Sequence, residues 1–136
     1  MANYKITDIE GIGPTFGEKL TAAGINDTDT LLKECASASG RKGVAEKTGI
    51  TESMLLKWAN MADLYRITGV GSEYSELLHE AGVDTVPELA QRNAANLTAS
   101  MLEVNEKRNL TRKPPTETSV QKWIDEAKTL AKVITH

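Results

Sequence analysis

Apolar side chains recur along most of this chain at intervals of three and four residues, the spacing that places them on one face of an α-helix. The two clearest stripes are Leu55, Trp58, Ala59 and Ala62, and Val120, Trp123, Ile124 and Ala127. Runs of alternating valine and isoleucine, which would indicate strands, do not occur. The pattern therefore predicts an all-α protein of about eight helices.

Several helix boundaries are marked by residues that suit helix ends. Asp27, Thr51 and Thr85 each precede an apolar stripe, where a side-chain oxygen can accept from a free backbone N–H of the first turn. Glu88 follows Thr85 by three residues, the spacing of a capping box. We expect long helices over residues 14–23, 41–48, 52–66, 97–108 and 117–131, and short ones after residues 27 and 85.

A glycine-centred segment occurs twice. Ile9-Glu10-Gly11-Ile12-Gly13-Pro14 is repeated as Ile67-Thr68-Gly69-Val70-Gly71-Ser72, and 67 minus 9 gives a spacing of 58 residues. The match continues through Ala23-Gly24-Ile25 and Ala81-Gly82-Val83, so the repeated unit is longer than a turn. We expect one domain over residues 1–136, with internal repeats at 9–66 and 67–134.

The two tryptophan helices are spaced differently from the two turns. Trp58 and Trp123 lie 123 minus 58, or 65, residues apart, so the second copy holds about seven extra residues. The polar stretch from Glu106 to Pro115 is the obvious place for them, and we expect it to be an exposed loop.

The first turn has at most one helical turn before it, whereas the second follows the long helix 52–66. We therefore predict that residues 117–134 fold back on the first turn, as residues 52–66 pack on the second. The result would be one compact body with pseudo-two-fold symmetry. Contacts between Trp123 and residues 12–20 would be the mark of this arrangement.

The repeated segments resemble the helix-hairpin-helix motif, in which glycine, an apolar residue and glycine are followed by a small residue and then an apolar one. Gly17 and Leu20 complete this pattern in the first copy, and Ser75 and Leu78 in the second. The whole chain, including Trp58-Ala59-Asn60-Met61-Ala62-Asp63-Leu64, is also similar to an uncharacterised bacterial family of tandem helix-hairpin-helix proteins catalogued as a domain of unknown function.

In the wider superfamily such hairpins hold nucleic-acid phosphates, with or without a bridging monovalent cation. Glycines allow the backbone to present N–H groups at the positive end of the next helix, where an anion is stabilised. The resemblance thus implies weak, sequence-independent binding of duplex DNA by a non-catalytic module. The turn residues it implicates are Gly11, Ile12, Gly13, Thr15, Gly69, Val70, Gly71 and Ser72.

The charge of the chain limits this expectation. There are 16 basic and 19 acidic residues, a net charge of −3, whereas dedicated nucleic-acid binders carry strongly basic faces. Pro14-Thr15 and Ser72-Glu73 stand where duplex binders often have lysine or arginine. The basic residues that could flank a groove are Arg41, Lys42, Lys107, Arg108, Arg112 and Lys113.

Two other interpretations stay open. The glycine turns can be purely architectural, and the Lys107 to Lys113 run can be a solvated loop. The protein would then be an interaction adaptor that uses the fold as a scaffold for a protein partner. An apolar or mixed patch on the face that carries the turns would favour the adaptor, and gathered basic residues would favour the phosphate binder.

Little else in the sequence points to chemistry. His79 has no second histidine or cysteine at ligand spacing, and no nucleophile, base and orienting group form a constellation, so we expect neither a metal site nor an enzyme, and no cofactor beyond a possible cation. Cys35 is the only cysteine and is expected in the core. Without a signal-peptide or membrane-spanning run, a cytoplasmic protein with no membrane contact is expected.

Overall fold

The computed structural model describes residues 3–9 and 11–135. In this part of the chain there are eight α-helices, one 3₁₀ turn and no strand, which confirms the all-α prediction; an isolated bridge pairs Lys5 with Asp27. None of these helices is long and apolar enough to cross a membrane. The elements are η1 (Ile6–Asp8), α1 (Pro14–Ala22), α2 (Thr28–Cys35), α3 (Ala38–Thr48), α4 (Glu52–Leu64), α5 (Ser72–Glu80), α6 (Val86–Ala90), α7 (Ala94–Arg108) and α8 (Glu117–Ala127).

Several predicted helix ends are confirmed because they depend on neighbouring residues, whereas α3 begins at Ala38 and α7 at Ala94, three residues earlier than predicted. Asp27 Oδ1 accepts from the Thr30 N–H at 2.8 Å, and Thr51 Oγ1 accepts from the Met54 N–H at 3.2 Å. The hydrogen bonds from Thr30 also lower the pKa of Asp27. Helix α3 ends at Gly49 as expected, with φ of 75°.

Helix α6 is capped from a distant helix, which corrects the capping box predicted for Thr85 and Glu88. The Thr85 side chain caps no N–H of α6, and a Glu88 carboxylate oxygen accepts from the Asp84 N–H at 3.0 Å. The first N–H of α6, from Val86, donates instead to Asp63 Oδ2 on α4 at 2.8 Å.

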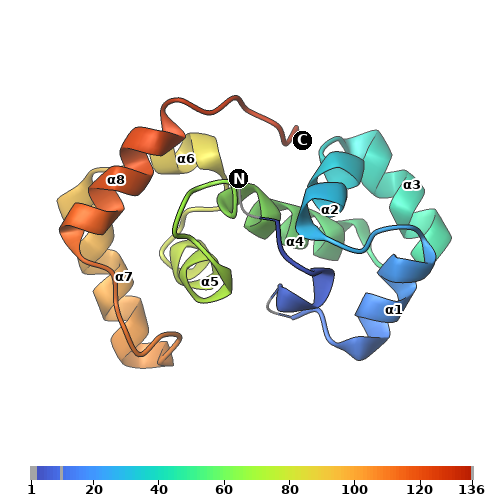
Figure 1. Ribbon diagram of the computed structural model, residues 1–136, viewed down its shortest axis with the longest axis horizontal. Helices are drawn as coiled ribbons and strands as arrows, with labels where there is room; N and C mark the ends of the chain where they lie inside the picture. The colour runs from blue at the N-terminus through green and yellow to red at the C-terminus, as the bar shows by residue number, and fades with distance from the viewer. Residues whose placement is uncertain (1–2, 10, 136) are drawn as a thin grey trace.

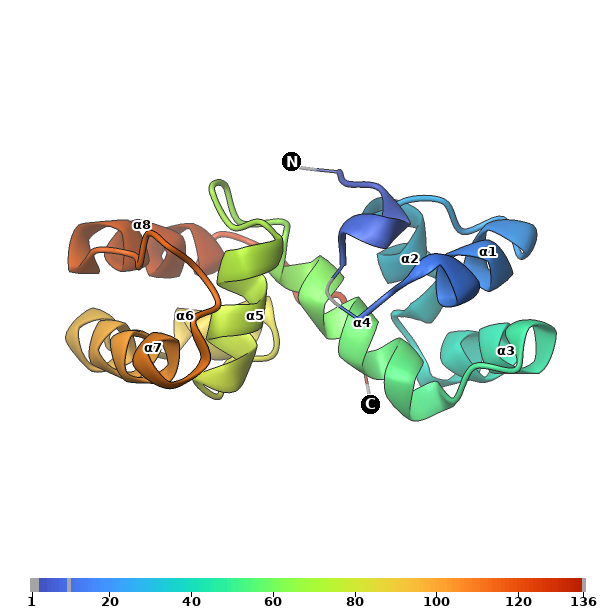
Figure 2. The same cartoon turned by 90° about the horizontal axis from the view of Figure 1, so that it is seen from below.

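The apolar core is divided into two clusters, each formed mainly by one repeat (Figure 1). We call η1 and α1 to α4 the first lobe, and α5 to α8 the second lobe. Leu20, Leu31 and Leu55 are fully buried in the first cluster, and Leu77, Leu89 and Leu97 in the second. Helix α4 runs obliquely from the first lobe toward α5 (Figure 2), and its Leu64 belongs to the second cluster.

The prediction that residues 117–134 pack on the first turn is wrong for helix α8. Helix α8 packs against α6 and α7, and Trp123 lies in the second cluster. The equivalent tryptophan of the first repeat, Trp58, lies in the first cluster. Each tryptophan helix closes the core of its own repeat, so no apolar stripe is left for exchange between repeats.

The segment that follows α8 does return to the first lobe (Figure 1). Helix α8 ends at Ala127, earlier than predicted, and the Arg66 guanidinium donates to the Ala131 carbonyl at 2.8 Å. Beyond it, Ile134 is buried in the first cluster and the Thr135 N–H donates to the Ala36 carbonyl at 2.8 Å. Residues 128–135 therefore form a strap that joins the two lobes.

Candidate functional site

The two glycine turns have the same backbone conformation. Gly11 and Gly69 have φ of 93° and 88°, a region that favours glycine because it has no Cβ. One residue further on, the Ile12 N–H donates to the Ile9 carbonyl and the Val70 N–H to the Ile67 carbonyl, both at 3.1 Å. A nine-residue helix, α1 or α5, follows each turn.

An indole ring lies against each turn. A Cβ built on Gly11 would lie 3.6 Å from Trp58 Nε1, and one on Gly69 would lie 3.6 Å from Trp123 Nε1. The same indoles pack on an aromatic residue of the next helix, with ring centroids 5.3 Å apart for Phe16 and Trp58. The corresponding distance for Tyr74 and Trp123 is 5.1 Å. These aromatic residues act as core anchors, as the sequence indicated.

Two of the predicted contact residues offer only their backbone. Ile12 is 4% exposed and Val70 is fully buried, so both side chains hold the turn against its lobe. An anion at either turn would therefore meet backbone N–H groups rather than these side chains.

The first turn is open to solvent. Gly13, Pro14 and Thr15 are exposed, and a Cβ on Gly13 would have no heavy atom within 4 Å. No side chain caps α1, and its first turn holds no acidic residue. The N–H groups of Thr15 and Phe16 have no acceptor within the helix and lie at its positive end. This arrangement suits an incoming anion.

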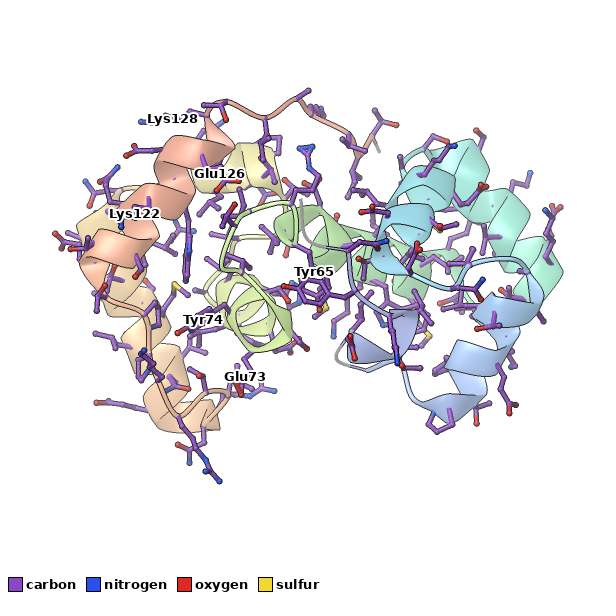
Figure 3. The ribbon with its side chains drawn as sticks, in the orientation of Figure 1. Tyr65, Glu73, Tyr74, Lys122, Glu126 and Lys128 are labelled. Atoms are coloured by element: carbon purple, nitrogen blue, oxygen red, sulfur yellow. The ribbon has the colours of Figure 1, made fainter. Side chains whose placement is uncertain are left out.

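The second turn already contacts a carboxylate of the protein. The Thr68 N–H lies 3.1 Å from Glu126 Oε1 and 3.3 Å from Oε2, and the Thr68 hydroxyl donates to Oε2 at 3.2 Å. Figure 3 shows Glu126 on α8 beside this turn. Glu73 adds a second negative charge in the first turn of α5. An external anion would meet repulsion from these two carboxylates.

The second turn is also more enclosed. A Cβ on Gly71 would lie 3.7 Å from the Tyr4 hydroxyl, and Gly71 and Ser72 are half-buried. A cavity of about 510 Å³ extends from Tyr4 and this turn to the loop before α8. The Tyr74 hydroxyl donates to the Lys113 carbonyl at 2.8 Å, which holds this loop beside the turn.

Residues 106–115, predicted as an exposed loop, are exposed at most positions, but the first of them belong to α7. Helix α7 continues to Arg108 and ends at Asn109, which has φ of 49°. The Asn105 side chain then bonds both the N–H and the carbonyl of Thr111, each at 3.0 Å. Arg112 and Lys113 are exposed, whereas Pro115 is buried.

Arg41 is not available for a ligand, which corrects its assignment as a flanking positive charge. It is 4% exposed, and its guanidinium donates to the carbonyls of Cys35, Ala36 and Thr135 at 3.0, 3.1 and 2.8 Å. The side chain thus caps the end of α2 and holds the strap.

The other basic residues are dispersed. Lys107 pairs with Glu103 at 3.3 Å, and Arg108 pairs with Glu80 at 3.0 Å. Lys42 is exposed on α3, and Arg112 lines a cavity of about 560 Å³ together with Glu73. Of the six basic residues considered from the sequence, Lys113 is the one that shares a cavity with a glycine turn.

An ion pair at the junction of the lobes was missed from the sequence. Asp63 is fully buried, and its Oδ1 lies 3.2 Å from Arg66 Nε, although the angle is too poor for a hydrogen bond. Burial raises the pKa of Asp63, while the Val86 N–H and Arg66 act in the opposite direction. The available signal was a charged i, i+3 pair in an otherwise apolar stretch of helix.

The remaining reactive side chains form no cluster. Within residues 3–9 and 11–135, no group of three His, Cys, Asp or Glu side chains could hold a metal ion. His79 Nδ1 lies 2.7 Å from Asp84 Oδ1. Cys35 is fully buried as predicted, and burial raises the pKa of its thiol to about 11.

Taken together, the helices and turns define an all-α protein with two glycine turns of the same backbone conformation, of which the first is the more exposed. Residues 10–130 match the family described as Domain of unknown function (DUF4332), and the chain belongs to this family. No curated protein and no solved structure matches the chain.

Proposed function

We propose that this protein is a non-catalytic binding module that contacts the phosphates of duplex nucleic acid, without reading base sequence, chiefly through the first glycine turn. The observation that carries the proposal is the exposed positive end of α1 at Gly13, with no acidic residue in its first turn. The second turn, held by Glu126, has a mainly structural role.

The resemblance of both turns to helix-hairpin-helix motifs supports this choice of ligand. Backbone N–H groups can donate to a phosphate oxygen directly, and a monovalent cation held by backbone carbonyl oxygens can bridge to one; neither contact depends on the base. Thr15 is exposed and its hydroxyl can join such a contact. The tandem helix-hairpin-helix arrangement itself is part of this proposal.

The charge of the protein sets the expected strength of binding. With a net charge of −3 and Arg41 buried, few cations can neutralise phosphates. Each neutralised phosphate contributes a slope of about −0.9 to the dependence of log affinity on log salt. We therefore expect weak binding with a shallow but measurable salt dependence.

The test is a fluorescence anisotropy titration of a labelled random duplex at low and moderate salt. The proposal expects binding at low salt that weakens as salt rises, and equal affinity for duplexes of unrelated sequence. Absence of binding at low salt, or binding that does not respond to salt, would overturn it.

A matched pair of variants locates the contact. Gly13→Glu places a carboxylate at the open turn, and Gly13→Gln adds a side chain of similar size without charge; φ of −87° and the open surroundings permit both. The proposal expects Gly13→Glu to weaken binding more than Gly13→Gln does. Equal affinities would move the site away from the first turn.

A protein-interaction adaptor is the second candidate. It is favoured by a groove of about 460 Å³ beside α1, lined by Thr7, Pro14, Gly17, Glu18, Thr21 and Ala22. An adaptor would show no salt-dependent binding of duplex, so the same titration separates the two functions.

A further inference from the structure

Two segments of the chain connect the lobes. One leads from α4 through the second turn into α5, and the other is the strap, residues 128–135 (Figure 1). Helix α4 also packs against α5 and bonds the start of α6, and we call this surface the junction. Each lobe otherwise keeps its own apolar cluster, and Leu64 is the residue of α4 that enters the second one.

The junction buries polar side chains. Asn60 lies four residues before Leu64 and so shares the face of α4 that meets the second lobe. Glu76 lies two residues from both Tyr74 and Leu78, which pack in the second cluster, so it points from the opposite side of α5. Asn60 is 8% exposed and Glu76 is 7% exposed. Neither Asn60 Oδ1 nor Glu76 Oε2 has a hydrogen-bond partner among the described residues.

A polar surface of this kind holds its two sides weakly. A buried oxygen without a partner has given up its hydrogen bonds to water, and separation of the two helices returns it to water. Relative motion of two lobes is the default unless the surface between them is large and apolar. The junction alone should therefore open at a lower free energy than either apolar cluster.

The strap supplies contacts that oppose this opening. It begins directly after α8 in the second lobe, yet Ile134 is 3% exposed and packs in the first cluster. The Arg66 guanidinium donates to the Ala131 carbonyl, and the Arg41 guanidinium donates to the Thr135 carbonyl, both at 2.8 Å. We infer that the strap is a latch, which holds the lobes in the arrangement of Figure 1 and whose release lets them separate at the junction.

One hydrogen bond across the junction reports its opening. The Val86 N–H of α6 donates to Asp63 Oδ2 of α4 at 2.8 Å, and both residues are fully buried. The Leu97 N–H donates to the Asn93 carbonyl at 2.9 Å, within the second lobe. Separation of the lobes exposes the Val86 amide but not the Leu97 amide. In the natural protein, hydrogen exchange followed by NMR and corrected for intrinsic rates should be at least about tenfold faster at Val86 than at Leu97. Equal rates would overturn separation of the lobes.

Two matched variants test the latch. Ile134→Ala and Ile50→Ala remove the same atoms from the first cluster, but Ile50 lies outside the strap. Relative to Leu97, exchange at Val86 should become at least about tenfold faster in Ile134→Ala and change by less than about twofold in Ile50→Ala. Circular dichroism checks that both variants keep their helices. A relative rate that changes equally in both variants, or in neither, would overturn the latch.

The distance between the lobes gives a second measurement. Lys33→Cys on α2 and Lys122→Cys on α8 place spin labels at exposed positions, one in each lobe. Cys35 is fully buried, and the natural protein shows whether it takes up label. Pulsed electron–electron double resonance should give a broader distribution, extending to longer distances, in Ile134→Ala than in Ile50→Ala. Equal distributions would overturn release of the strap as the step that separates the lobes.

A second matched pair tests the role of the polar junction. Glu76→Met and Glu73→Met make the same change on α5, at a buried and at an exposed position. In the Ile134→Ala background, Glu76→Met should narrow the distance distribution, because an apolar side chain loses by exposure what the carboxylate gains. Glu73→Met should leave the distribution broad. The same result for both variants would overturn the inference. None of these measurements uses nucleic acid, so their outcome is independent of the proposed function.

Discussion

The first and second glycine turns have nearly the same backbone and very different surroundings. Both have a glycine at positive φ with an indole against it. At the first turn Gly13 faces open space, whereas at the second the Glu126 carboxylate accepts from Thr68, and Tyr4 lies close to Gly71. The comparison teaches that local sequence forms such a turn, while distant side chains decide how much of it stays open to solvent.

The largest expected effect tests what the two turns share. Trp58→Ala and Trp123→Ala should each lower the free energy of unfolding by about 3 to 5 kcal/mol, because each removes a buried aromatic side chain from one lobe. Urea denaturation followed by circular dichroism measures this, with Leu102→Ala as an exposed control. A loss below about 1 kcal/mol for either tryptophan would show that its turn is not held by the indole.

The second prediction concerns the strap. Arg41→Gln should lower the free energy of unfolding by about 1 to 3 kcal/mol, since it leaves buried carbonyls without a donor. Lys42→Gln removes the same charge from an exposed neighbour and should change stability by less than about 0.5 kcal/mol. Duplex affinity of folded Arg41→Gln should equal that of Lys42→Gln. A much larger loss of affinity for Arg41→Gln would mean that Arg41 does reach the ligand.

The third prediction asks whether Glu126 closes the second turn. Glu126→Gln keeps an acceptor for the Thr68 N–H but removes the charge. In a Gly13→Glu background, where a carboxylate blocks the first turn, this change at the second turn should raise duplex affinity about threefold. Asp125→Asn makes the same charge change at the preceding residue, which is exposed and accepts a hydrogen bond from Gln121. If both variants raise affinity equally in anisotropy titrations, net charge rather than the turn is responsible.

The smallest effect concerns Asp63, which lies at the junction and beside neither turn. Its pKa is raised in the folded state, so its contribution to stability is greatest below the ordinary pKa and is lost as pH rises through the raised one. The free energy of unfolding of the natural protein minus that of Asp63→Asn should therefore fall as pH rises above about 4, the ordinary pKa of an aspartate. Urea denaturation across this range measures the difference, and a difference that grows with pH would contradict the raised pKa.

Features set by neighbouring residues were predictable from the sequence. The all-α class, the caps at Asp27 and Thr51 and the end of α3 at Gly49 follow from local patterns and were confirmed. The positive φ angles of Gly11 and Gly69 could also be inferred, because a tight turn with positive φ favours glycine.

Features set by distant residues were not predictable in this way. The burial of Arg41 depends on Thr135, and the closure of the second turn depends on Glu126 and Tyr4. The cap of α6 by Asp63 and the packing of α8 within its own repeat depend on which surfaces meet in the folded chain. Periodicity shows which residues are buried, but it does not show which partner buries them.

The most direct test of the account compares Gly13→Glu with Gly71→Glu in duplex anisotropy titrations at low salt. Neither position has positive φ, and a Cβ at either meets ordinary contacts or open space, so both variants should fold. The account predicts a loss of affinity of at least about tenfold for Gly13→Glu and less than about twofold for Gly71→Glu. Equal losses, or a larger loss for Gly71→Glu, would contradict it.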